Sequence, residues 1–119
     1  MEIVLDQLGR PPTENKVSRM RSSYQKAKIV RTWRQAACAL WSQYSETVVS
    51  PPVVVVATPL HQNRRSPQDP GACLPAVKAV VDGAVDAGLL EDDDYRYVRA
   101  VILNAPDFCG VDGLRVRLR

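Results

Sequence analysis

The sequence is poor in the side chains that usually build a zinc site or a disulfide framework. It has one histidine, His61, and three cysteines, Cys38, Cys73 and Cys109, which are far apart and form no Cys-x-x-Cys pair. A zinc site and a set of disulfides are therefore not indicated. We expect three buried or half-buried thiols in a reducing cytoplasm, and we place His61 in a loop rather than at a ligand site.

Long apolar segments are also missing. The longest strongly apolar run, Val53 to Ala57, is far shorter than the roughly 20 residues that a membrane-spanning helix needs. The first residues lack the basic segment followed by an apolar run that marks a secretory signal peptide, so we expect neither export nor a membrane partner. What remains is an ordinary globular composition over 119 residues, which suits a single domain, 1–119.

Charge is present in modest excess but is unevenly distributed. The formal net charge is +3. Before residue 40 the only acids are Glu2, Asp6 and Glu14, whereas most of the others lie between Asp69 and Asp94. A basic half beside an acidic pocket suits a polyanionic substrate held at a metal, and the alternative is a solvated charged helix face. The bases before residue 40 are Arg10, Lys16, Arg19, Arg21, Lys26, Lys28, Arg31 and Arg34.

Helical periodicity marks two segments. From a start between Ser18 and Ser22 to about Tyr44, apolar residues recur every three or four positions and predict a core-facing helix. A second helix is expected from near Pro75, because proline suits a first helical turn, to Gly88, because glycine tolerates the left-handed conformation that ends many helices. The first stripe consists of Tyr24, Ala27, Val30, Trp33, Ala37, Leu40, Trp41 and Tyr44.

Strands are predicted where residues are β-branched or alternate in polarity. The unbroken valine run from Val53 to Val56 suggests a strand buried on both faces. Together with the two helices, the strands predict an α+β domain, with about four strands in a mixed sheet packed against two main helices. The predicted strands are Met1–Asp6, Val53–Thr58, Tyr95–Ala105 and Leu114–Arg119.

The remaining segments contain glycine, proline and polar residues and are expected to be loops. Alternation within the third strand divides its residues between the two faces of the sheet. Tyr97, Arg99, Val101 and Leu103 are expected on one face, and Val98, Ala100 and Ile102 on the other. The predicted loops and turns are Gly9–Lys16, His61–Gln68 and Pro106–Gly113.

Carboxylates gather around the second helix. Lys78, Asp82 and Asp86 follow one another at four-residue steps and share one helix face, where an exposed salt-bridged stripe is the simplest interpretation. Asp69 precedes the helix, and the pair Asp92–Asp93 follows it. Carboxylate oxygens are the ligands that magnesium prefers, with water and substrate phosphate completing its shell.

These residues are sufficient for phosphodiester hydrolysis. A bound magnesium ion can activate water and neutralise the phosphate, and a lysine such as Lys78 can offset charge in the transition state. The same residues would equally describe an acidic turn without a metal. The basic first helix and the pair Arg64–Arg65 are suited to contact phosphates, which position DNA without reading its sequence.

The order of residues after Pro75 is more specific for one protein family than the composition is. Lys78 opens the run Lys-Ala-Val-Val-Asp-Gly, Asp86 opens the run Asp-Ala-Gly-Leu-Leu, and the pair Asp92–Asp93 follows. This pattern resembles the signature of the RusA family of Holliday junction resolvases. The resemblance implies a homodimeric α+β nuclease, from a bacterium or a phage, that uses magnesium to cut four-way DNA junctions in recombination and repair.

The resemblance also implies roles for individual residues. By position, Asp69, Lys78 and Asp93 match the catalytic residues, and Asp69, Asp92 and Asp93 match the magnesium ligands. A weaker similarity covers Pro11–Pro12 and Asn15–Lys16, because the family often has a proline-containing segment followed by asparagine. The predicted DNA contacts are Asn15, Lys16, Arg64 and Arg65.

One departure from the family pattern leaves a second function open. Many members have an aspartate and an asparagine just after the first acid, and here Gly71 and Ala72 occupy those places. Neither residue can bind a cation through its side chain. The alternatives are that Asp82 or backbone oxygens contribute to the site, or that the chain is a non-catalytic protein that binds DNA junctions. An unrelated metal-dependent phosphohydrolase is a more remote alternative.

Overall fold

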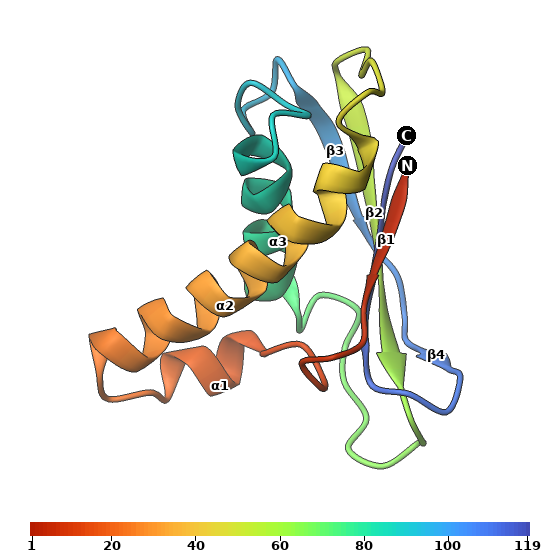
Figure 1. Cartoon of the computed structure of the whole chain (residues 1–119). Helices are drawn as coiled ribbons and strands as arrows, with labels where there is room; N and C mark the ends of the chain where they lie inside the picture. The colour runs from red at the N-terminus through yellow and green to blue at the C-terminus, as the bar shows by residue number, and fades with distance from the viewer.

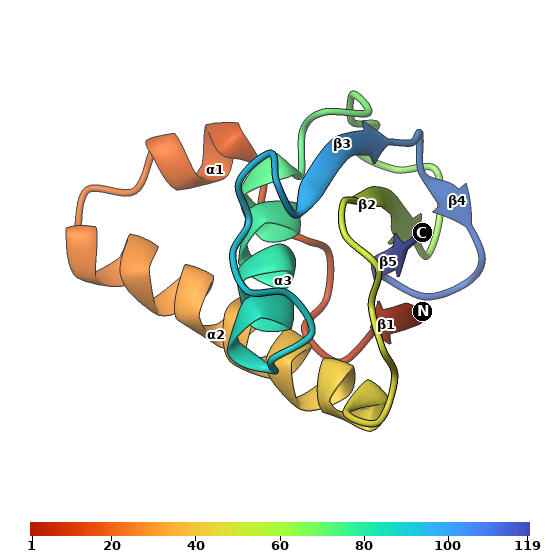
Figure 2. The same cartoon turned by 90° about the horizontal axis from the view of Figure 1, so that it is seen from above.

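The computed structural model describes residues 1–119 and has a layer of helices packed on one face of a mixed β-sheet (Figures 1 and 2). The predicted α+β class is therefore confirmed, and α2 and α3 are its two main helices. In chain order the elements are β1 (Glu2–Leu5), α1 (Glu14–Ser18), α2 (Ser23–Trp41), the 3₁₀ helix η1 (Ser42–Tyr44), β2 (Val53–His61), α3 (Leu74–Asp86), β3 (Val98–Leu103), β4 (Asp107–Phe108) and β5 (Gly113–Leu118).

The sheet has the strand order β1-β5-β2-β3, and β4 pairs with the end of β2. The β1–β5 and β5–β2 pairs are antiparallel, whereas β3 and β4 run parallel to β2. A parallel pair needs a long crossover, and α3 supplies it between β2 and β3. This β2-α3-β3 unit fixes α3 against the sheet and carries every acidic residue of the predicted site.

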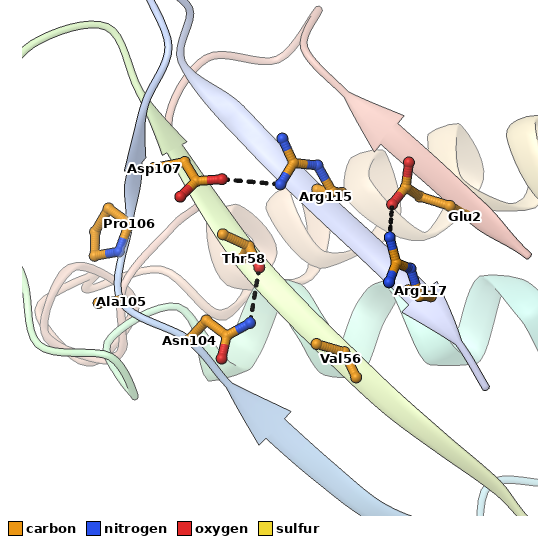
Figure 3. A pocket seen from close by; sticks show the side chains of 9 residues that line it. All are labelled: Glu2, Val56, Thr58, Asn104, Ala105, Pro106, Asp107, Arg115 and Arg117. Atoms are coloured by element: carbon orange, nitrogen blue, oxygen red, sulfur yellow. Dashed lines mark hydrogen bonds and ion pairs between the residues drawn. The ribbon is translucent and has the colours of Figure 1, made fainter.

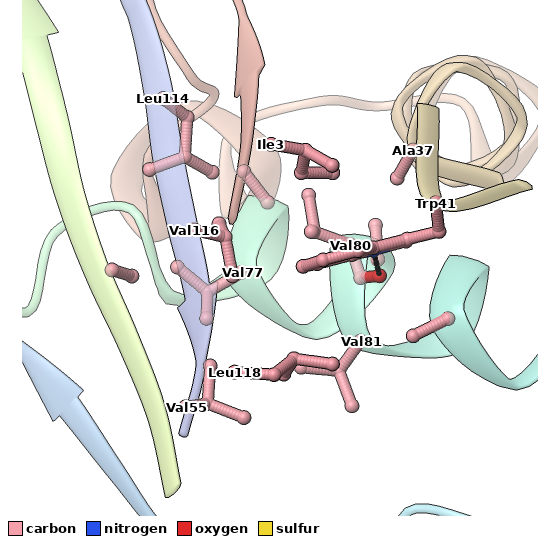
Figure 4. Packing of buried hydrophobic residues seen from close by; sticks show 14 of the residues in the cluster. Ile3, Ala37, Trp41, Val55, Val77, Val80, Val81, Leu114, Val116 and Leu118 are labelled. Carbon is pink, nitrogen blue, oxygen red and sulfur yellow. Dashed lines mark hydrogen bonds between the residues drawn. The ribbon is translucent and has the colours of Figure 1, made fainter. Parts of the chain in front are cut away.

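One core of 20 buried residues lies between the helices and the inner face of the sheet. Strand β5 shows the expected alternation, since Leu114, Val116 and Leu118 are buried in this core. Trp41 of α2 is fully buried, and its indole N–H donates to the backbone oxygen of Val80 in α3 at 3.1 Å (Figure 4). This bond satisfies the polar atom of a large buried ring, as a buried tryptophan requires.

The two main helices cross at Gly83 with their backbones nearly in contact. A Cβ atom at this position would lie 2.8 Å from the Arg34 backbone oxygen and 2.8 Å from the Ala37 Cβ atom. No residue with a side chain fits there without moving α2. A glycine in the middle of a helix usually destabilises it by about 1 kcal/mol, and here it permits the close crossing.

The second face of the sheet is not covered by a helix (Figure 1). Val53 and Val55 are buried, but Val54 and Val56 on the other face are only half-buried. The expectation that the valine run is buried on both faces is therefore wrong. An apolar run alone does not show how many layers of structure pack against it.

The first half of α2 is also more exposed than its apolar stripe predicted. Trp33, Ala37 and Trp41 are buried, but Tyr24 is 67% exposed and Ala27 is exposed as well. The reason is that this half of the helix extends past the sheet, beside α1 (Figures 1 and 2). Periodicity shows which face of a helix is apolar, but not how far along that face another element packs against it.

Helix α1 occupies part of the segment expected to be a loop. It has five residues, none of them buried, so it carries no apolar stripe. Its beginning is fixed by Thr13, whose hydroxyl accepts a hydrogen bond from the backbone N–H of Lys16 at 3.1 Å. Threonine is a common residue at this capping position, and it was the only local sign of the helix.

Strand pairing accounts for two further corrections at the end of β2. His61 lies in the strand, not in a loop, and is 1% exposed. It pairs with Phe108 of β4, a short strand inside the segment expected to be a turn. A two-residue strand has too few positions to show alternation, so only the tertiary pairing reveals it.

Two more expectations about side-chain environment are corrected. The register of β2 and β3 shifts between Val53 and Val54, so Val98 and Leu103 both pack against the core instead of lying on opposite faces. All three cysteines are free, but Cys109 is exposed rather than buried. No helix in the structure combines the length and apolar character needed to cross a membrane.

Candidate functional site

Two of the predicted site residues lie near the N-terminal end of α3, one in the segment before α3 and one in α1. Asp69 and Asn15 line a cavity of about 320 Å³ beside the start of α1, together with Glu14. The backbone N–H of Glu14 donates to the oxygen of Ala72 at 3.0 Å, which holds the segment before α3 against α1. The Asp69 carboxylate is exposed and makes no hydrogen bond or ion pair. Gly71, which is expected to replace a second acid if the chain is RusA-like, lines the same cavity.

The other acids of the predicted site lie along α3 and just after it. Asp82 is eight residues after Leu74, which corresponds to about 12 Å along the helix axis. Arg34 of α2 approaches this part of α3 and makes a two-pronged ion pair with Asp86, with Nε–Oδ2 and Nη2–Oδ1 distances of 2.6 and 2.8 Å. Its third nitrogen, Nη1, is 3.9 Å from Oδ2 of Asp82.

The close helix crossing explains this arrangement. Because Gly83 touches the backbone of Arg34, the guanidinium group of Arg34 reaches the two aspartates that flank that glycine by one and three positions. Arg34 lowers the pKa of Asp86, chiefly by hydrogen bonding to its carboxylate. The two acids of the expected stripe, Asp82 and Asp86, therefore pair with Arg34 of α2 and not with Lys78 along α3.

Asp93 lies close enough to Asp82 for its carboxyl group to influence the pKa of Asp82. The pKa of Asp82 is raised, first because burial disfavours its charged form and then because of the neighbouring Asp93; Arg34 opposes the rise. Two neighbouring carboxylates repel each other, and a bound cation relieves that repulsion.

The end of α3 brings Asp93 back along the helix. Gly88 has a φ of +81°, and the N–H of Leu89 donates to the Ala84 oxygen at 3.0 Å, which is the hydrogen bond of a glycine-ended helix terminus. Leu89 and Leu90 are then buried in the core. These contacts turn the chain after α3 and direct the following acidic segment toward Asp82.

The acids next to Asp93 have local roles. The Asp92 carboxylate accepts a hydrogen bond from the backbone N–H of Asp93 at 2.8 Å, which fixes the turn between them. Asp94 pairs with Arg96 at 2.7 Å.

Lys78 is exposed on α3, one turn before Asp82, and its ammonium group has no ion-pair partner. A free ammonium group at this distance from the acid pair is available to a phosphate.

No three histidine, cysteine or acidic side chains lie together as a ready metal site. Asp69, Asp92 and Asp93 are therefore not gathered into one cluster in this chain. The Asp82–Asp93 pair nevertheless fits magnesium, which is commonly held by one or two carboxylates while water and substrate phosphate complete its shell. A cation there would offset both the burial of the Asp82 carboxylate and the charge of the neighbouring Asp93, which together raise the pKa of Asp82.

The predicted DNA-contacting arginines, Arg64 and Arg65, lie in the loop after β2. Arg10 holds this loop by donating to the backbone oxygens of Arg65 at 2.8 Å and Ser66 at 3.0 Å, and it pairs with Asp112 at 3.2 Å. Arg64 lies over the Phe108 ring, 4.1 Å from its centre. Both Arg64 and Arg65 are exposed. The loop therefore presents two cations on a fixed backbone.

His61, the last residue of β2, precedes this loop and is not part of the Asp82–Asp93 pair. It is 1% exposed, and its ring meets the Phe108 ring edge-on, with centres 6.0 Å apart. The pKa of His61 is lowered, first by burial and then by the charge of Arg10. A buried neutral histidine beside an arginine suits a structural role.

A further cavity, of about 510 Å³, lies on the uncovered face of the sheet (Figure 3). Its charged side chains pair with one another, Arg115 with Asp107 at 2.9 Å and Arg117 with Glu2 at 3.1 Å. The charges of this cavity are therefore already balanced, and no reactive group is left over. The acid pair on the helix side remains the better candidate site.

Sequence reasoning treated Arg34 as an ordinary surface base and gave Asp82 only a secondary place. The one available signal was Gly83, because a glycine inside a helix marks a close approach of another backbone. Comparison with known proteins adds no family: no protein-family model matches the chain, and no curated protein matches it. The candidate site is supported by its geometry.

Proposed function

We propose that this chain is a magnesium-dependent endonuclease that cuts branched DNA, with its reactive centre at the Asp82–Asp93 pair. The observation that carries the proposal is that the half-buried Asp82, near Asp93, lies one helical turn after Lys78, which has no ion-pair partner. A carboxylate pair beside a free cation suits the cleavage of a phosphodiester, because the acids hold a metal and the cation binds a phosphate oxygen.

Each residue of this centre has a defined part. Asp82 and Asp93 would hold magnesium, which supplies activation of water and neutralisation of the phosphate. Arg34 keeps Asp86 out of the pair by binding both of its oxygens. Lys78 would orient the scissile phosphate. Because the cation binds the ionised carboxylates, magnesium binding should weaken as the pH falls toward the pKa of Asp82.

The remaining family-based assignments are part of the same proposal. DNA phosphates would be contacted by Asn15, Lys16, Arg64 and Arg65. Asp69 and Asp92 are further candidates for magnesium ligands. A four-way junction needs two cuts, and a symmetric homodimer would supply two equivalent sites. A bacterial or phage-encoded cytoplasmic protein acting in recombination and repair fits these properties.

Cleavage of a synthetic four-way junction tests the proposal. We expect magnesium-dependent nicking by the wild-type chain, and a loss of about a hundredfold in Asp82→Asn, Asp93→Asn and Lys78→Ala. The matched control is Asp6→Asn, an exposed acid before the helices that should cut normally. Nicking that persists at the wild-type rate in all three site variants would show that the reactive centre lies elsewhere.

A non-catalytic junction-binding protein is the second candidate, and Gly71 and Ala72 favour it. They leave the cavity beside Asp69 without the second acid and the asparagine of the family pattern. This function predicts tight binding of the junction and no nicking with magnesium or manganese. The double variant Gly71→Asp with Ala72→Asn separates the two candidates, because new cutting only in this variant would identify a degenerate nuclease.

A further inference from the structure

The part of helix α1 that follows Glu14 and the first half of α2 form an arm that carries positive charge and no negative charge. The sequence has no aspartate or glutamate between Glu14 and Glu46. We define the basic arm as residues 15–31. Its bases are Lys16, Arg19, Arg21, Lys26, Lys28 and Arg31.

None of these six cations is neutralised within the molecule. The ion pairs of the structure involve other arginines, namely Arg10, Arg34, Arg96, Arg115 and Arg117. All ion pairs of the structure lie outside the arm. Between residues 15 and 31 there is no acid to offset the six bases, which leaves a positive field that attracts polyanions.

The shape of the arm also suits an external partner. The first part of α2 extends past the sheet, and α1 runs beside it (Figures 1 and 2). Between the two helices lies a hollow of about 780 Å³ that is lined by Lys16, Arg19 and Arg21 together with Met20 and several polar side chains. Three cations around one hollow can bind a phosphate group from several sides.

An acidic membrane surface is a poor match for the arm. Helices that lie on membranes need a continuous apolar face opposite their basic face. The only strongly exposed large apolar residue between residues 15 and 31 is Tyr24. A water-soluble polyanion with regularly spaced charges, such as the backbone of a DNA duplex, fits the arm better.

The arm also leads to the acid pair. After Arg31, helix α2 continues to Arg34, and a groove of about 430 Å³ follows these residues to Asp86 on α3. A duplex lying along α2 would therefore approach the α2–α3 crossing, where Asp82 and Asp93 lie. We propose that the basic arm is the docking surface for the sugar–phosphate backbone of a DNA duplex, and that it binds independently of the carboxylates.

This inference rests on the proposed function only for the class of partner. The test is binding of a fluorescent 20-base-pair DNA duplex in EDTA over a range of salt concentrations, using the full chain. The double variant Arg21→Ala with Lys28→Ala should reduce the slope of log affinity against log salt by about two, since each lost phosphate contact removes about 0.9. The matched control, Arg99→Ala with Arg119→Ala, removes the same charge from exposed, unpaired positions outside the arm and should change the slope little.

Each outcome of this experiment is decisive. An equal loss of slope in both double variants would show attraction by net charge alone and overturn the inference, as would an unchanged slope in the arm variant. Arm-dependent binding of an RNA duplex or of phosphatidylserine vesicles, without arm-dependent binding of DNA, would also overturn it. Because EDTA prevents cutting, arm-dependent DNA binding by a chain that never nicks a junction would support the arm and remove only the nuclease proposal.

Discussion

The two ends of α3 carry the same kind of residue in different surroundings. At the N-terminal end, the Asp69 carboxylate faces a cavity and has no charged partner. In the C-terminal half, Asp82 and Asp86 meet Arg34, and Asp93 lies near Asp82. The difference shows that spacing along a helix does not decide the chemistry of its acids; the neighbouring helix does.

The physical cause of the difference is the position at which α2 crosses α3. The crossing falls at Gly83, so the side chains of α2 reach the acids near that glycine and none of them reaches Asp69. The turn after Gly88 adds a second acid to the same end. The C-terminal half is thus held in place, whereas the N-terminal end lies open.

Replacing the crossing glycine should have the largest effect on this comparison. In Gly83→Val the new side chain would meet the backbone of Arg34 and Cys38 and separate the helices, which should reduce the free energy of unfolding by about 3 kcal/mol. The control is Gly71→Ala at the open end, where the new Cβ would meet only Leu103, at 3.9 Å, and should cost less than about 0.5 kcal/mol. Urea unfolding measures both. Equal losses would mean that the crossing is not tightly packed.

Magnesium should stabilise the folded chain through the acids at the C-terminal end of α3 and not through Asp69. At a concentration ten times its dissociation constant, the ion should add about 1.4 kcal/mol to the free energy of unfolding of the wild type. This gain should disappear in Asp82→Asn and Asp93→Asn and persist in Asp69→Asn. Thermal unfolding with and without magnesium gives the answer without any assay of activity. A gain that disappears only in Asp69→Asn would place the ion at the open end instead.

The ion pair between α2 and α3 should contribute a smaller amount. Arg34→Gln should lower the free energy of unfolding by up to about 1 kcal/mol at pH 7, because the pair is partly exposed to water. The lowered pKa of Asp86 means that this contribution is complete above the unfolded pKa of 3.8 and is lost as the pH falls through the folded value. Arg31→Gln, which removes an unpaired cation one turn earlier, should change stability little. A loss that stays constant down to pH 2 would contradict the role of Asp86.

The charge on Asp82 should have the smallest effect and the opposite sign. Its pKa is raised in the folded protein, so its ionisation opposes folding; that cost is complete above the folded pKa and absent below the unfolded value of 3.8. In metal-free buffer, Asp82→Asn should therefore be slightly more stable than the wild type at pH 7, by less than about 1 kcal/mol, and equal to it at pH 3. Urea titrations at both pH values check this, with Asp6→Asn as the exposed control. Lower stability of Asp82→Asn at pH 7 would show that its bond to Arg34 outweighs the desolvation.

Much of the architecture was readable from local pattern. The alternation of β5 and the apolar stripe around Trp33 and Trp41 gave the correct inward faces, because period and burial are linked within one element. Pro75 and Gly88 marked the limits of α3 for stereochemical reasons that act within a few residues. Helix α1 and strand β4 were missed because such short elements carry no period.

The sequence by itself determined which residue types are available: a basic first half, an acidic segment around α3 and a lysine within the helix. Only the tertiary structure decided which of them meet. Arg34 and Asp86 are 52 residues apart, and Asp93 lies near Asp82 because Gly88 turns the chain back along α3. Such contacts depend on where two helices cross and how a helix ends against the core, and neither is encoded by the spacing of charged residues along the chain.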